Sequence, residues 1–288
     1  MTLRRRAAAA LCAVALASAT GGQVTAQDRL SGRAWATRSE VMARHGMVAT
    51  SHPLATQIAL EILKEGGTAV DAAIAANAFL GLGDPGNSGM GGDLFAIVWD
   101  AKTKQLHGLN ASGRSPRGMT LAALQAKKLT QIPVSGPLAV SVPGCVDGWF
   151  SLHGKFGKLP MTRLLAPTIA YAREGIPMTS EVTDNMADYR LQGRLAAAGD
   201  TIANFRKVYQ PTGAFPKKGD VFRNPALADS LEAVSRGGRD AYYKGPIAAA
   251  IAAHVKARGG FLSTEDFAQH TSEWVTPIST TYRGYQVY

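Results

Sequence analysis

The histidines are the first residues whose type and spacing could do chemistry. The sequence has six: His45, His52, His107, His153, His254 and His270. No pair of them has the spacing of an HExxH or CxxC-type ligand motif, so we predict no metal site. The chain also lacks the G-x-S-x-G motif that exposes the nucleophilic serine of many hydrolases. These patterns favour neither a metalloenzyme nor a serine hydrolase of that type.

Cysteine and paired carboxylates are the next candidates. Of the two cysteines, Cys12 lies in a segment that we expect to be removed, so the mature chain has no internal disulfide. Cys145 could be a nucleophile, but it follows an apolar Val-Pro-Gly segment, which favours a small buried thiol. Glu265 and Asp266 stand at a predicted helix start, where carboxylates stabilise the first turn more often than they catalyse.

A glycine-rich segment covers residues 81–92 and contains a literal G-x-G-x-x-G at 81–86. The dinucleotide-binding fingerprint requires a strand before this motif and a helix after it. Here a helical pattern precedes it and an alternating, strand-like segment follows, while Pro85 removes one N–H from the supposed phosphate cradle. We therefore reject a nucleotide site and predict no cofactor. The glycines indicate a tight loop where backbones approach closely.

Two helices are predicted before this loop. Ser51 is the expected cap of the first, which has Pro53 in its first turn, an apolar stripe, and Gly66-Gly67 at its end. The second covers about residues 70–80, with Thr68 and Asp71 in capping-box positions. It is apolar on all faces, so we expect it to be buried between layers.

The remaining elements mix strands with helices. We expect a hairpin of strands 94–99 and 106–112, a buried strand over 138–142, and a strand or hairpin within 276–288. Helices are expected over 145–156, 161–174, 225–236 and 247–258. Because the order lacks regular βαβ alternation, the pattern favours an α+β layered sandwich over a doubly wound sheet.

The first 26 residues have the features of a secretory signal peptide. Arg4, Arg5 and Arg6 precede an apolar stretch over 7–19, and small residues at 24–26 offer a cleavage site. The stretch is short for a bilayer, which disfavours the alternative of an anchor helix. We expect residues 27–46 to form an irregular lead-in. We expect a periplasmic or secreted protein that does not associate with the membrane after the signal is removed.

Composition is typical of a globular chain, with 46% hydrophobic and 18% charged residues, and it excludes a disordered protein. The formal net charge is +10, but the basic residues are scattered without interleaved aromatic residues. This pattern disfavours nucleic-acid binding and is compatible with an acidic substrate.

Ordered short segments over about residues 46–288 closely resemble the γ-glutamyltransferase (glutathione hydrolase) family. Each segment alone is weak evidence for the resemblance, and together in this order they are strong evidence. They are Ser51-His52-Pro53-Leu54-Ala55, Gly66-Gly67-Thr68-Ala69-Val70-Asp71-Ala72-Ala73, Asn87-Ser88-Gly89-Met90-Gly91-Gly92-Asp93, Gly113-Arg114-Ser115-Pro116, Val142-Pro143-Gly144, Gly157-Lys158-Leu159-Pro160, Leu165-Ala166-Pro167, Ala172-Arg173-Glu174-Gly175, Asn224-Pro225, Tyr243-Lys244-Gly245 and Tyr282-Arg283-Gly284-Tyr285.

The resemblance implies an N-terminal-nucleophile hydrolase fold, an αββα sandwich formed by one precursor that cleaves itself into large and small subunits. The nucleophile is a threonine at the new N-terminus of the small subunit, and its own α-amine serves as the base. Residues 47–288 resemble part of the large subunit. Because no threonine here has the processing context, we expect the nucleophile beyond Tyr288 and an incomplete sandwich in this fragment, with no catalytic residue of its own.

One substrate-binding residue transfers by position. The resemblance implies that Arg114 holds the α-carboxylate of a γ-glutamyl group, and a planar guanidinium suits a carboxylate because it can bind both oxygens. The alternative is an arginine at a hairpin end paired with a structural acid. The implied partners are a small-molecule γ-glutamyl substrate and the small subunit of the same precursor.

Three activities stay open at this point. The first is γ-glutamyl hydrolysis or transfer through an acyl-threonine intermediate, with glutathione as one substrate. The second is a cephalosporin or glutaryl acylase of the same fold, because Arg114 is followed by Ser115-Pro116 where the family commonly has Glu-x-Ala-Pro. The third is a catalytically inactive secreted binding protein.

Overall fold

The computed structural model describes residues 40–188 and 202–288, and it divides between Gly46 and Met47 into two units. The expected signal peptide, residues 1–26, lies outside the described residues. So does most of the expected lead-in 27–46, of which residues 40–46 are exposed and irregular. The fold described below is that of the unit Met47–Tyr288.

The first two helices pack against each other. Helix α2 (Pro53–Lys64) has His52 at its N-cap, where the ring Nδ1 accepts a hydrogen bond of 3.2 Å from the Leu54 N–H. The expected cap, Ser51, was therefore wrong by one residue, and its hydroxyl instead donates to Asp84. Because Pro53 is the first helical residue, the cap must be the residue directly before it.

Helix α3 (Ala69–Gly83) begins with the predicted capping box between Thr68 and Asp71. The fully buried Asp71 carboxylate also accepts backbone N–H groups of Lys158 and Leu159, which fixes this helix start to a distant turn. The helix is buried on most faces, as expected, but it runs beyond 80. The glycine-rich loop consequently begins at Asp84.

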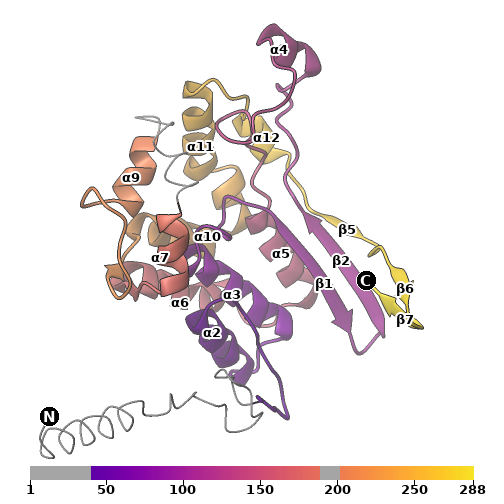
Figure 1. The fold of residues 1–288 in the computed structure, drawn as a ribbon. Helices are drawn as coiled ribbons and strands as arrows, with labels where there is room; N and C mark the ends of the chain where they lie inside the picture. The colour runs from indigo at the N-terminus through magenta and orange to yellow at the C-terminus, as the bar shows by residue number, and fades with distance from the viewer. Residues whose placement is uncertain (1–39, 189–201) are drawn as a thin grey trace, which may run out of the picture. The chain divides into compact units, whose positions relative to one another are not determined.

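Four longer helices contribute most of the remaining core: α6 packs against α3, and α10 packs against α6 (Figure 1). Helix α10 contains a break at Gly238, near the expected end at 236. Large buried side chains of the core include Phe79, Trp149 and Tyr243. The longer helices are α5 (Cys145–Phe156), α6 (Met161–Glu174), α10 (Pro225–Tyr243) and α11 (Pro246–Ala257).

Short elements connect or flank these helices. Helix α12 confirms the predicted role of Glu265 and Asp266, since both lie in its first turn and Asp266 completes a capping box with Ser263. The short elements are α4 (Leu121–Ala126), α7 (Ser180–Ala187), α9 (Ala203–Tyr209), α12 (Thr264–Ala268), β3 (Ile176–Pro177), β4 (Val221–Phe222), β6 (Thr280–Tyr282) and β7 (Tyr285–Val287). Strands β6 and β7 form the hairpin expected within 276–288.

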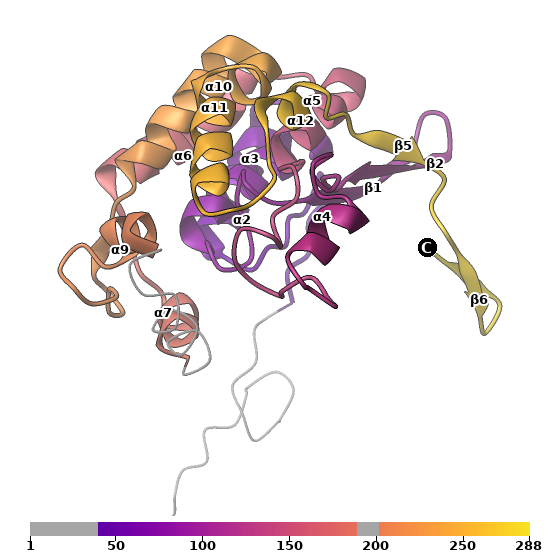
Figure 2. The ribbon, with the colours of Figure 1, turned by 90° about the horizontal axis from the view of Figure 1, so that it is seen from above.

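The central sheet is antiparallel, in the order β1 (Leu94–Asp100), β2 (Gln105–Ala111), β5 (Glu273–Val275). One face of β1 and β2 packs on α5 (Figures 1 and 2). On the opposite face, Phe95, Ile97 and Trp99 are 68%, 57% and 60% exposed. We call this the open face of the sheet.

The strand expected over 138–142 was wrong. These residues are irregular: the Ala139 N–H donates to the nearby Gly136 carbonyl, and the Val142 N–H donates to the distant Arg114 carbonyl. Pro143 has no N–H to continue a ladder. The α+β class is confirmed, and helices cover one face of the three-stranded sheet. No helix among residues 40–188 and 202–288 is both long and apolar enough to cross a membrane.

Candidate substrate-binding site

Arg114 lies three residues after the end of β2, and its backbone is held by two neighbouring segments. Its carbonyl accepts the Val142 N–H at 3.0 Å, and the preceding Gly113 N–H donates to Asp93 Oδ1 at 3.2 Å. A Cβ at Gly113 would lie 1.4 Å from the Val142 carbonyl oxygen, so no larger residue fits. This close approach of two backbones fixes where the Arg114 side chain starts.

The segment before α5 is fixed in the same way. A Cβ at Gly144 would lie 2.0 Å from the Ala111 carbonyl oxygen. The Gly92 carbonyl accepts the N–H groups of both Gly144 and Cys145 at 2.9 Å. The predicted tight glycine loop thus meets the end of β2 and the start of α5, and the three segments form one backbone cluster beneath Arg114.

The Arg114 side chain extends into solvent, with 66% of it exposed. Its Nη2 forms an ion pair with Oε1 of Glu273, which is itself 53% exposed. Phe95, Asn110 and Glu273 are paired across the three strands, so the three side chains share the open face. A guanidinium has five N–H donors, so one carboxylate at Nη2 leaves donors for a second. The group can therefore bind an anionic ligand at this edge of the sheet.

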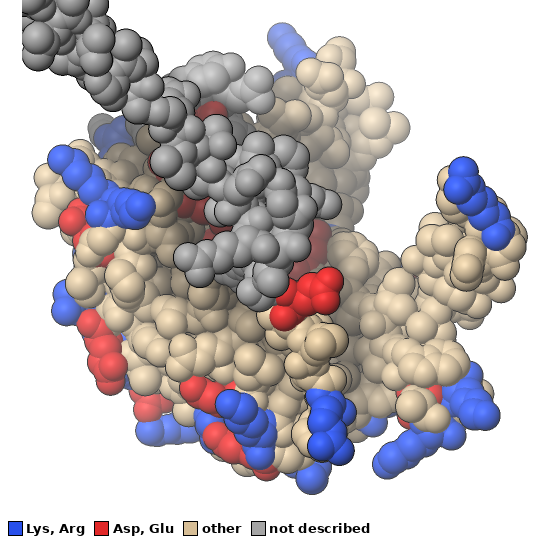
Figure 3. All heavy atoms as spheres, turned by 60° about the horizontal axis from the view of Figure 1, so that its bottom comes forward, with Lys and Arg blue, Asp and Glu red and all other residues tan. Residues whose placement is uncertain are grey.

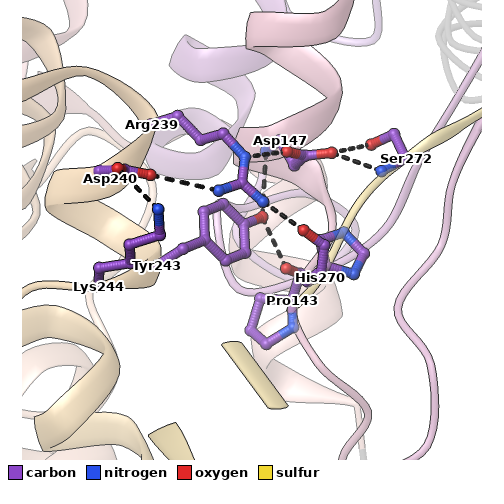
Figure 4. A network of polar contacts seen from close by, with 8 residues as sticks. All are labelled: Pro143, Asp147, Arg239, Asp240, Tyr243, Lys244, His270 and Ser272. Carbon is purple, nitrogen blue, oxygen red and sulfur yellow. Dashed lines mark hydrogen bonds and ion pairs between the residues drawn. The ribbon is translucent and has the colours of Figure 1, made fainter. Parts of the chain in front are cut away.

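A polar network around the buried Asp147 and Tyr243 links α5, α10 and the segment before β5 (Figure 4). The Asp147 carboxylate, on α5, accepts hydrogen bonds from Arg239 Nε and from the backbone and hydroxyl of Ser272, with the backbone bond at 2.6 Å. Burial alone would raise the pKa of Asp147, but the hydrogen bonds from Ser272 and Arg239 outweigh it and hold the pKa below its usual value. The carboxylate is therefore ionised at neutral pH.

Arg239 and Tyr243, both on α10, complete the network. The Arg239 guanidinium lies 4.4 Å from the centre of the Tyr243 ring and donates to the His270 carbonyl. The Tyr243 hydroxyl donates to the Pro143 carbonyl at 2.7 Å and accepts the Asp147 N–H at 3.0 Å. The network thereby ties the backbone cluster below Arg114 to the segment that leads into β5.

Sequence reasoning missed these network residues because they are far apart in the chain. One signal was present: Asp147 is the single charged residue in the otherwise apolar run from Val142 to Phe150. A charged residue inside a buried helix face needs a partner, and a search for that partner would have pointed to an arginine.

Two other candidates have plain structural roles. Cys145 is buried, its Sγ lies 3.4 Å from the Asn77 side-chain oxygen, and burial raises its pKa to about 12, so the thiol stays protonated. His270 is buried and stacked on Tyr243, and burial lowers its pKa. Within 40–188 and 202–288, neither ring nitrogen of His270 has a hydrogen-bond partner, and no group of three His, Cys, Asp or Glu could hold a metal.

Charged side chains of both signs are interspersed on the face drawn in Figure 3. The described residues on that face form no continuous basic stripe of the kind that follows a nucleic-acid backbone.

Comparison with known proteins gives concordant matches. Residues 55–288 match the family model described as gamma-glutamyltranspeptidase. The "Glutathione hydrolase-like YwrD proenzyme" of Bacillus subtilis is 35% identical over 243 residues, which are 84% of this chain and 45% of that protein. The "Glutathione hydrolase proenzyme" of the same organism is 34% identical over 248 residues, covering 85% of this chain and 41% of that protein.

The solved structures agree. A cephalosporin acylase from Bacillus halodurans matches with a TM-score of 0.82 and 39% identity over 88% of this chain and 47% of that chain. This likeness confirms the fold class that the sequence predicted. The chain spans less than half the length of the curated relatives named above.

Proposed function

This chain belongs to the γ-glutamyltranspeptidase family, and from that premise we propose that it is the large-subunit part of an exported γ-glutamyltransferase or glutathione hydrolase. The observation that carries the proposal is the placement of Arg114. Its backbone is fixed by the Gly113 approach, and its guanidinium is exposed at the edge of the open face. That arrangement suits the α-carboxylate of a γ-glutamyl group.

In the proposed reaction the nucleophile is a threonine supplied by the small subunit. Its hydroxyl attacks the γ-amide carbon, the amine leaves with a proton, and the γ-glutamyl group remains as an ester on the threonine. Water or an acceptor amine then attacks the ester and frees the threonine. Arg114 takes no part in bond making. It holds the carboxylate so that the amide carbon lies at the nucleophile.

We place the small subunit on the open face. Phe95, Ile97 and Trp99 form an apolar row there, on a strand that lies at the edge of the described sheet. A contiguous apolar row exposed to water marks an interaction site more often than a free surface. A second sheet packed on this row would complete the sandwich and would bring its N-terminal residue near Arg114.

A second candidate is an acylase that removes glutaryl side chains, and the match to a cephalosporin acylase favours it. A glutaryl group has the same terminal carboxylate as a γ-glutamyl group but lacks its α-amine. Arg114 serves both substrates equally well, so the α-amine decides between the two activities. The third candidate is an inactive binding protein, which would differ from the other two because its small subunit would have no threonine nucleophile.

One experiment separates the three. The precursor that contains this chain and its small subunit is expressed, cleavage is followed by gel electrophoresis, and hydrolysis of γ-glutamyl, glutaryl and 4-aminobutyryl anilides is compared. The proposal expects cleavage and a strong preference for the γ-glutamyl anilide. Preference for the glutaryl anilide would establish the acylase. An uncleaved, inactive precursor would favour the binding protein.

A further inference from the structure

The segment that leads into β5 is attached to the helical layer at two points. The His270 carbonyl accepts a hydrogen bond from Arg239, and Ser272 donates both its backbone N–H and its hydroxyl to Asp147. Asp147 and Arg239 come from different helices, α5 and α10. Strand β5 has only three residues and therefore few ladder hydrogen bonds of its own. Contacts with two helices set the position of the segment that leads into it.

Glu273 follows Ser272 directly and is the residue that contacts Arg114. Successive side chains of a strand point to opposite faces. With the Ser272 side chain turned inward to Asp147, the Glu273 side chain is directed to the open face, opposite Asn110 in the register. The Asp147–Ser272 bonds thus fix the side of the sheet from which Glu273 reaches Arg114.

A long exposed arginine has many rotamers, and binding a ligand restricts them. The loss of this rotamer freedom weakens ligand binding. The ion pair with Glu273 restricts the Arg114 rotamers before a ligand arrives, and it uses one terminal nitrogen. The other edges of the guanidinium stay available for a second carboxylate.

We propose that Asp147 is a positioning residue for the substrate carboxylate, acting through Ser272 and Glu273 on the Arg114 guanidinium. This inference rests on the proposed function and adds residues to its site. Both Asp147 oxygens are used, Oδ1 by Arg239 and Oδ2 by Ser272. A buried ion pair is weak support for stability by itself, because desolvation offsets the attraction. A role in positioning Glu273 would explain the Asp147–Arg239 pair, which stability alone does not explain.

The test compares two substrates in the cleaved two-subunit enzyme: the γ-glutamyl anilide, which has the α-carboxylate, and the 4-aminobutyryl anilide, which lacks it. The variants are Asp147→Asn, Ser272→Ala and Glu273→Gln. The matched control is Asp240→Asn, because Asp240 also pairs with Arg239 but is exposed and has no bond to Ser272. The measured quantity is the ratio of kcat/KM for the two substrates.

We expect Asp147→Asn to lower this ratio roughly 3- to 12-fold, mainly by raising KM for the γ-glutamyl anilide while kcat is kept. Ser272→Ala, which leaves the Asp147–Arg239 pair in place, and Glu273→Gln should lower it in the same direction. Asp240→Asn should leave the ratio within about twofold of the wild type, as expected for an exposed surface pair.

Equal losses on both substrates in Asp147→Asn and Ser272→Ala would show a merely structural role and overturn the inference. If Asp147→Asn does not fold, Ser272→Ala decides by the same criterion. A higher affinity in Glu273→Gln would show that Glu273 competes with the substrate, which also overturns it. A wild-type enzyme that ignores the α-carboxylate would refute the role of Arg114 itself, a result distinct from failure of the positioning residues alone.

Discussion

Replacing Arg114 by alanine is the most direct perturbation of the candidate site. The side chain is exposed and its ion pair with Glu273 lies in solvent, so its removal should cost at most about 1 kcal/mol of stability. The backbone at this position is held by Gly113 and Val142, which the substitution leaves unchanged. Precursor cleavage should therefore proceed, and the enzyme should fold.

The effect on the reaction should be much larger. Once the small subunit covers the site, a charge-assisted bidentate contact contributes about 2–4 kcal/mol to transition-state binding. Its loss should lower kcat/KM roughly 30- to 1000-fold. Arg114→Lys should recover little, because an ammonium keeps the charge but lacks the planar fork. Steady-state kinetics with the γ-glutamyl anilide measure the loss, and the 4-aminobutyryl anilide is the control.

Two results would refute this reasoning. If both anilides lose activity equally, Arg114 is a structural partner of Glu273 and does not bind the carboxylate. If neither loses activity, another basic group holds the substrate.

Four further outcomes are expected. Asp71→Ala should destabilise the enzyme by about 3–5 kcal/mol, because several buried backbone N–H groups lose a charged acceptor, as denaturant unfolding would show. Gly144→Ala should abolish soluble folding because its Cβ overlaps a β2 carbonyl, whereas Gly154→Ala, whose Cβ meets no atom within 4 Å, should melt at or above the wild-type temperature. Since burial lowers the pKa of His270, the unfolded chain protonates first on acidification; the contribution of His270 to the free energy of unfolding should fall as the pH drops below about 6.5, by at most roughly 1.4 kcal/mol per pH unit, and a rise in the free energy of unfolding would contradict this. Residues 27–288 alone should show no turnover and fold poorly, because the open face stays in water; a cooperative melt of a monomer would oppose this.

Local signals predicted most of the helices. The bounds of α5 and α6 follow from apolar periodicity and from the Pro and Gly residues beside them, and the Thr68–Asp71 capping box was visible in four consecutive residues. These features depend on contacts within one or two turns, which a sequence displays directly.

Features that depend on distant segments were harder to predict. The segment before Pro143 is apolar enough for a strand, but the Val142 N–H donates to the Arg114 carbonyl far away in the sequence, which no local pattern records. The same holds for Asp147 and Ser272, which are 125 positions apart. Arg114 was proposed through family resemblance, and its partner Glu273 was not foreseen, because pairing between β2 and β5 is set by the whole fold.

The apolar row on β1 also bears on how such an enzyme would assemble after export. In the proposed precursor the two halves would be tethered, and a flexible tether gives an effective concentration in the millimolar range. The row of Phe95, Ile97 and Trp99 would then be covered within the same molecule before it meets another copy. Cleavage would remove the tether afterwards, so the contact formed under tethering would have to hold the separated halves together at the far lower concentrations outside the cell. On this view, the apolar area on β1 would be large enough to keep the separated subunits associated at the low concentration of the cleaved enzyme.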